Sequence, residues 1–98
     1  MALESWDVYE IHSDEPIHGI KLRGRLRKFS IEQDITLLVE NASDVNNAVR
    51  YAVPSQYSVD FVNAEIVSIV PSAAIEQVLE GVQNPVLSKL KINQIDRY

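Results

Sequence analysis

The segment Ile20-Lys21-Leu22-Arg23-Gly24-Arg25-Leu26-Arg27-Lys28-Phe29 decides the fold that this sequence predicts. From Ile20 onward, Leu22, Leu26 and Phe29 recur at steps of four and three, which is the spacing of one face of an α-helix. Basic side chains occupy mostly the other faces. We therefore expect a helix here, and Ser30 with Gln33 resembles a capping box that would begin a different helix.

The segments on either side of this helix alternate between strand and helix patterns. Trp6, Val8, Tyr9 and Ile11 are interleaved with polar residues, as in a half-buried strand. A turn at residues 41–44 joins two β-rich runs into a hairpin. The expected strands cover 6–12, 35–39, 48–53, a stretch beginning at 75 and, after a break at 81–85, extended structure over 86–95; a second helix is expected over 55–70.

This order of elements predicts an α+β fold. The pattern β-α-β-β-α-β, followed by an extra C-terminal strand, favours a ferredoxin-like two-layer sandwich in which two helices cover one face of a mainly antiparallel sheet. The 98 residues suffice for one core, so we expect a single domain over 1–98. Because that fold serves many functions, it assigns none by itself.

Composition narrows the classes of function. The chain has no cysteine, and its two histidines, His12 and His18, show no organised acidic partner, so we expect neither a metal nor a cofactor. The formal charge of -5 argues against nucleic acid. No apolar run is long enough for a membrane span, and the N-terminus lacks signal-peptide features. We expect a cytoplasmic monomer with no membrane partner.

Positive charge is nevertheless concentrated before and within the first helix. Five of the nine basic residues lie between Lys21 and Lys28. A glycine turn at His18-Gly19, between a strand and a helix, can aim backbone N–H groups at an anion that Arg23 then grips. The pattern predicts a local anion site.

Two short motifs resemble the acylphosphatase family. The family signature G-x-V-Q-G-V-x-F-R is matched in its second part by residues 17–23, which keep the glycine (Gly19) and the arginine (Arg23). The family's V-x-N at the end of the next strand is matched by Val39-Glu40-Asn41, at the family's spacing from Arg23.

The resemblance implies hydrolysis of the carboxyl–phosphate bond of small acyl phosphates, without metal or cofactor. It implies that the phosphate, whether of an acyl phosphate or inorganic, is held by the loop and by the arginine, and that Asn41 positions the attacking water. The implied phosphate-binding residues are Ile17, His18, Gly19, Ile20 and Arg23, and the implied catalytic residues are Arg23 and Asn41.

Two alternatives stay open. The loop before Ile17 is longer than in the family and contains Asp14, Glu15 and Pro16, which bring negative charge and remove an N–H donor. These changes favour a non-catalytic binding or structural module with a degraded phosphate loop. A nucleic-acid binder using the basic helix is a weaker alternative, which the net charge opposes.

Overall fold

The computed structural model describes residues 5–14, 17, 22–83, 85–86 and 91–92. Its elements follow the expected order closely. They are β1 (Trp6–His12), α1 (Leu22–Glu32), β2 (Leu38–Asn41), β3 (Ala48–Pro54), α2 (Asp60–Ile69), β4 (Ala74–Val82), β5 (Pro85–Val86) and β6 (Lys91–Ile92).

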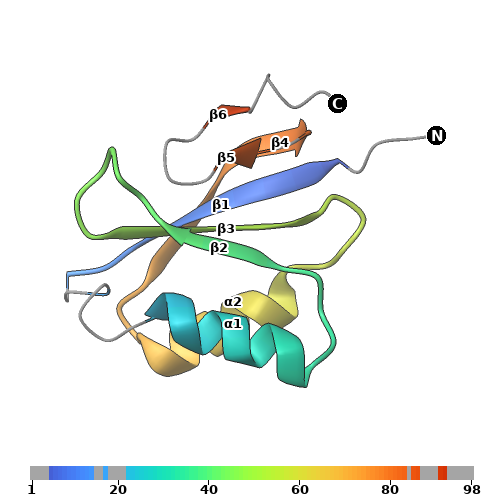
Figure 1. Cartoon of the computed structure of the whole chain (residues 1–98). Coiled ribbons are helices and arrows are strands. Elements are labelled where there is room, and N and C mark those ends of the chain that lie inside the picture. Colours follow the sequence, from blue (N-terminus) through green and yellow to red (C-terminus); the bar gives the residue numbers. More distant parts are fainter. Residues whose placement is uncertain (1–4, 15–16, 18–21, 84, 87–90, 93–98) are drawn as a thin grey trace.

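Strands β1 to β4 form one open sheet in the order β2-β3-β1-β4, in which every neighbouring pair is antiparallel (Figure 1). A separate pair, β5 and β6, is also antiparallel. The prediction of an α+β fold with an antiparallel sheet and two helices is confirmed. None of the helices in the described residues is long and apolar enough to cross a membrane.

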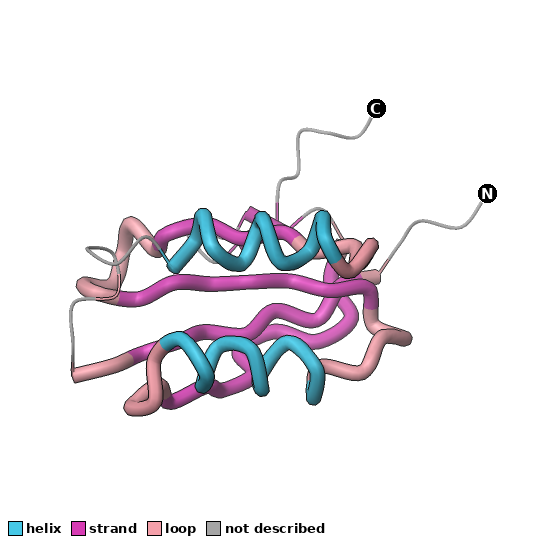
Figure 2. The backbone as a smooth tube through the Cα atoms, turned by 90° about the horizontal axis from the view of Figure 1, so that it is seen from below, coloured by secondary structure: helices cyan, strands magenta, loops and turns pink. Residues whose placement is uncertain are grey.

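Both helices lie on the same side of the four-stranded sheet (Figures 1 and 2). The buried side chains explain this arrangement, because residues of α1, of α2 and of alternate positions in the strands belong to one apolar cluster. Phe29 of α1 also meets Phe61 of α2, with ring centroids 5.4 Å apart. The fully buried members of the cluster are Ile11, Ile17, Leu22, Leu26, Val49, Tyr51, Val53 and Ile66.

A Schellman motif ends α1 at Glu32. Asp34 has φ 55°, its N–H donates to the Ile31 carbonyl at 3.3 Å, and the Ile35 N–H donates to the Ser30 carbonyl at 2.9 Å. This pairing satisfies carbonyls that a helix end otherwise leaves without partners. The motif uses the chain up to Ile35, so β2 begins only at Leu38. The prediction that this strand begins at residue 35 is therefore wrong.

Ser30 lies inside α1, so the prediction that a different helix begins there is wrong. Its hydroxyl donates to the Arg27 carbonyl at 2.7 Å, a bond within the helix. The second helix was predicted over 55–70 and is confirmed from Asp60 onward. The residues before it form a turn in which the Tyr57 N–H donates to the Pro54 carbonyl at 2.9 Å.

Strand β4 continues to Val82, although a break was expected at 81–85. Gly81 has φ +64°, and its N–H donates to Oδ1 of Asp7 at 3.0 Å. The register between β1 and β4 shifts on either side of Val8, so extra residues of β4 are accommodated as bulges. Of the extended segment expected over 86–95, only residues 86 and 91–92 lie within the described residues, as parts of β5 and β6.

Tyr51 links the sheet to α2. Its ring stacks on Tyr9 with centroids 5.1 Å apart, and its hydroxyl donates to Oδ1 of Asn63 at 2.5 Å. Burial, together with the neighbouring Tyr9, raises the pKa of Tyr51 well above its ordinary value of 10.0. The folded protein therefore holds this proton at a pH at which the unfolded chain releases it.

The raised pKa of Tyr51 predicts that the parent protein loses stability at alkaline pH. The variant Tyr51→Phe, which has no hydroxyl to ionise, should not show this loss. At neutral pH the variant should lose about 1 kcal/mol, because the bond to Asn63 is gone. Above about pH 10 the unfolded state binds fewer protons than the folded state, so the free energy of unfolding of the parent protein falls with pH. The gap between parent and variant should then narrow.

Urea unfolding at neutral and alkaline pH measures this gap. Tyr57→Phe is the matched control, since Tyr57 is exposed. A gap that stays constant from neutral pH to about pH 11 would contradict the assignment.

Candidate functional site

Arg23 lies in the first turn of α1 and faces the end of β2. Its Nη1 is 3.6 Å from Oε1 of Glu40, and Nη2 of Arg27 is 3.5 Å from the other oxygen of the same carboxylate. Asn41 follows Glu40 and is the last residue of β2. The fold thus brings Arg23 to the residue next to Asn41, although the two are far apart in the sequence.

All three charged side chains of this group are about half-exposed. Ion pairs in such surroundings contribute about 0–1 kcal/mol, so the contacts are readily exchanged for another anion. The Arg23 guanidinium is therefore already partnered by a carboxylate of the protein itself. The sequence motif did not indicate this, because Glu40 stands at its variable position.

Ile17 is the one residue of the predicted loop, 17–20, that lies within the described residues. Its side chain is fully buried, and its N–H donates to Oδ1 of Asn47 at 2.8 Å. The donor is thus already used by a side chain of the β2–β3 turn. His18, Gly19 and Ile20 lie outside the described residues, so their predicted role in holding phosphate stays a prediction.

Asn47, in the β2–β3 turn, joins three segments. Its Oδ1 accepts from the Ile17 N–H, and its Nδ2 donates to the Ser13 carbonyl at 3.1 Å. It adopts φ 54°, a left-handed conformation that asparagine tolerates better than most residues. Asn47 therefore anchors the end of β1 and the start of the loop that leads to α1.

A second polar group lies on the sheet face away from the helices. Val49, Tyr51 and Val53 pack toward the helices, so Arg50 between them points to the opposite face. The strand registers place four charged residues in one row across the sheet, each directly opposite the next. The row of register partners runs from β2 to β4 as Glu40, Arg50, Glu10 and Glu76, although at the sheet edge the Glu40 carboxylate contacts Arg23 and Arg27 of α1.

Arg50 is only 1% exposed, and two carboxylates hold it. Its Nε donates to Oε2 of Glu10, and its Nη1 donates to Oδ1 of Asp44, both at 2.6 Å. The bond from Arg50 lowers the pKa of the Asp44 carboxyl below its ordinary value. Glu10 is itself 7% exposed, so this ion pair connects β1, β3 and the β2–β3 turn in a largely buried position.

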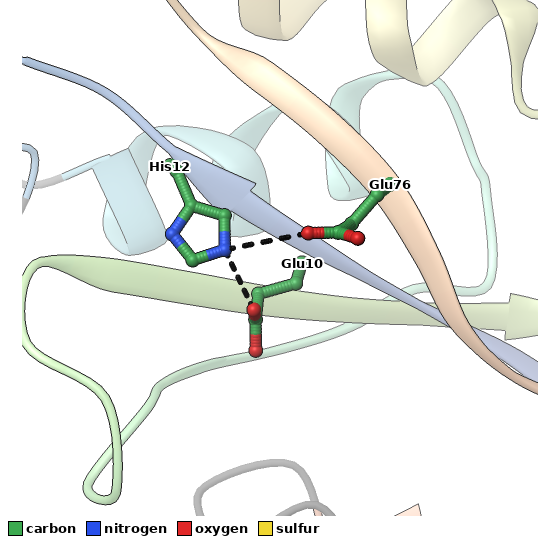
Figure 3. A group of neighbouring side chains, drawn as sticks. All are labelled: Glu10, His12 and Glu76. Atoms are coloured by element: carbon green, nitrogen blue, oxygen red, sulfur yellow. Dashed lines mark hydrogen bonds and ion pairs between the residues drawn. The ribbon is translucent and has the colours of Figure 1, made fainter.

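His12 extends the group toward β4 (Figure 3). Its Nε2 is 2.6 Å from Oε1 of Glu10 and 3.7 Å from Oε1 of Glu76. The expectation that neither histidine has an organised acidic partner is therefore wrong for His12. The Glu10-x-His12 spacing was a usable signal, since it places both side chains on one face of a strand. The third member, from β4, had no signal in the sequence.

The three side chains offer one imidazole nitrogen and two carboxylate oxygens that all lie within 4.8 Å of one another. Among the described residues, this is the group whose atoms are placed to hold a metal ion. Arg23, Arg27 and Glu40 form a separate group of half-exposed charges beside the end of β2.

Comparisons of the chain with protein-family models, with curated proteins and with solved structures found no match. The resemblance to acylphosphatases therefore depends on the motif residues of the sequence.

The buried ion pair predicts a large and asymmetric effect of substitution. Arg50→Met should destabilise the protein by about 3–5 kcal/mol, because it leaves the Glu10 carboxylate buried without its cation. Adding Glu10→Gln should restore part of that loss, since the buried charge is then gone. Urea unfolding of the two single variants and the double variant measures the coupling.

Arg25→Met is the control, because Arg25 is exposed on α1 and its substitution should change stability by less than about 0.5 kcal/mol. If the double variant is as unstable as the sum of the single variants, Glu10 and Arg50 are not coupled.

Proposed function

We propose that this chain is an acylphosphatase-type domain that binds the phosphate of small acyl phosphates and hydrolyses their carboxyl–phosphate bond. We also assign its architecture to the ferredoxin-like class. The support for that class is the βαββαβ order of the first six elements, the antiparallel strand order β2-β3-β1-β4, and the helices on one face.

One observation carries the functional proposal: Arg23, at the start of α1, lies beside the end of β2, where Asn41 is located. The contact at 3.6 Å between Arg23 and Glu40 measures this proximity. Phosphate binding requires a cation such as the Arg23 guanidinium, and water positioning requires an amide such as that of Asn41, which the proposal assigns to the same site.

In the proposed reaction, the Arg23 guanidinium holds oxygens of the phosphoryl group and stabilises the charge that spreads over them in the transition state. The amide of Asn41 orients a water molecule toward phosphorus. The oxygen of that water bonds to phosphorus, the bond from phosphorus to the acyl oxygen breaks, and the carboxylate leaves with its electron pair. The products are the free carboxylate and inorganic phosphate, which keeps both protons of the water and leaves as H₂PO₄⁻. Positioning and electrostatics supply the catalysis, so no side-chain nucleophile is needed.

Glu40 determines how readily the phosphate binds. A phosphate that reaches Arg23 must displace a monovalent carboxylate held at 3.5–3.6 Å by two arginines. A phosphoryl group offers more negative charge and more acceptor oxygens than that carboxylate, so it can displace it, with part of its affinity lost in the exchange.

A second candidate function is a non-catalytic module that keeps the fold without turnover. It is favoured by the hydrogen bond from the Ile17 N–H to Asn47, because a donor spent on a side chain is not directed at a phosphate. In that case the group of Arg23, Arg27 and Glu40 stabilises the surface only weakly.

The first test is the hydrolysis of benzoyl phosphate by the purified chain, followed by its ultraviolet absorbance. Arg23→Gln should reduce kcat/KM by about 10²-fold or more, because a donor aimed at the transition state is removed. Arg25→Gln, on the same helix, should leave the rate unchanged.

A rate equal to that of buffer, or one that Arg23→Gln leaves intact, rejects the hydrolase. Titration with inorganic phosphate, followed by the amide chemical shifts of residues 17 to 20, then separates the two candidates. Specific shifts would still identify an anion-binding loop, and their absence would leave the non-catalytic module.

A further prediction concerns Glu40. Glu40→Gln removes the internal competitor and should tighten the binding of inorganic phosphate by about two- to fivefold, the range expected for an exposed ion pair. Isothermal titration calorimetry measures the change, and Glu32→Gln at the far end of α1 is the matched control. Weaker binding in Glu40→Gln would mean that Glu40 organises the arginines and does not compete with phosphate.

A further inference from the structure

We propose that Glu10, His12 and Glu76 form a binding site for a divalent transition-metal cation such as Zn²⁺ on the sheet face opposite the helices. The site uses neither Arg23 nor Asn41. Its tests therefore succeed or fail independently of the proposed hydrolase.

The strand geometry brings the three ligand side chains close together. Glu10 and His12 are two residues apart on β1 and share one face, while Glu76 is the register partner of Glu10 on antiparallel β4. Figure 3 shows that the same imidazole nitrogen of His12 faces both carboxylates. Around a tetrahedral Zn²⁺ with bonds of about 2.0–2.2 Å, ligand atoms lie roughly 3.3–3.6 Å from one another.

The distances in the structure bracket that separation. The imidazole Nε2 is 2.6 Å from the Glu10 oxygen and 3.7 Å from the Glu76 oxygen, so a small side-chain rotation of the partly exposed His12 brings the ligand atoms to the separation that the ion needs. Glu76 has the freedom to follow, because its side chain is 65% exposed.

Charge provides a second, independent argument. Glu10 and Glu76 stand directly opposite each other on neighbouring strands, an arrangement that repels unless a cation lies between them. Arg50 pairs with Glu10 and with Asp44. The carboxylates of Glu10, Glu76 and Asp44 carry three negative charges and the Arg50 guanidinium carries one positive charge. The group therefore has a net charge of -2 when His12 is neutral. A divalent cation neutralises that excess.

Arg50 also prepares Glu10 as a ligand. It holds Oε2 of Glu10 at 2.6 Å from within the protein, and this fixes the carboxylate so that Oε1 is directed at His12. Outer partners that fix a ligand in this way raise the affinity of a site for its metal. A nearly buried carboxylate, oriented by a buried arginine, is a built feature of the fold.

The ligand set selects the type of metal. One imidazole nitrogen with two carboxylate oxygens suits Zn²⁺ and its first-row neighbours, whereas Mg²⁺ and Ca²⁺ prefer shells made of oxygen alone. His12 is 38% exposed at its side chain, so the site opens to solvent. Three protein ligands with a water-accessible fourth position are the arrangement of open zinc sites.

Calorimetric titration of the chelator-treated full chain with ZnCl₂ tests the site, with MgCl₂ as the comparison. We expect one Zn²⁺ per chain, and affinity that falls by about tenfold or more in His12→Ala and in Glu76→Gln. Zn²⁺ should also raise the Tm of the parent protein, since it binds the folded state. Both substituted side chains are partly exposed, so circular dichroism should show an intact fold.

Two matched variants complete the test. His18→Ala removes the other histidine of the chain, and Glu80→Gln removes an exposed carboxylate of β4; both should bind Zn²⁺ like the parent protein. Absence of Zn²⁺ binding overturns the proposal. So does binding that survives both His12→Ala and Glu76→Gln, or binding that His18→Ala abolishes.

Discussion

The guanidinium of Arg50 is the group on which the polar face of this protein depends. A cation that is 1% exposed is tolerated only where carboxylates surround it, and Glu10 and Asp44 do so at 2.6 Å each. Because Glu10 belongs to β1 and Asp44 to the β2–β3 turn, one side chain joins three parts of the sheet. The same contact directs Glu10 toward His12, so the candidate metal ligands follow from the burial of Arg50.

Strand β3 separates this polar group from the apolar core. Its alternate residues Val49, Tyr51 and Val53 pack toward the two helices, while Arg50 between them faces the other side. Tyr51 continues the connection to α2 through Asn63, and burial raises the pKa of its hydroxyl. Every residue of β3 is buried, which explains why this strand carries both the core and the ion pair.

The candidate anion site is built differently, from exposed groups with weak mutual contacts. Arg23 and Arg27 share Glu40 at distances of 3.5–3.6 Å, and a ligand must replace that carboxylate to reach them. Asn47 fixes the start of the adjoining loop through Ile17 and Ser13. The proposed hydrolase requires an anchored loop beside exchangeable charges, whereas the non-catalytic module keeps the same contacts without turnover.

Local pattern alone determined most of the secondary structure. The alternation of Trp6 to His12 and the steps of four and three in α1 specify burial on one face, and burial stabilises these elements wherever they pack. The sequence did not reveal where α1 ends, because Asp34 takes a left-handed conformation that is more typical of glycine. Only the tertiary structure decided that Glu76 of β4 lies opposite Glu10 and beside His12. That contact depends on the register of two strands distant in the sequence, and the energy that sets the register comes from the whole sheet and its core.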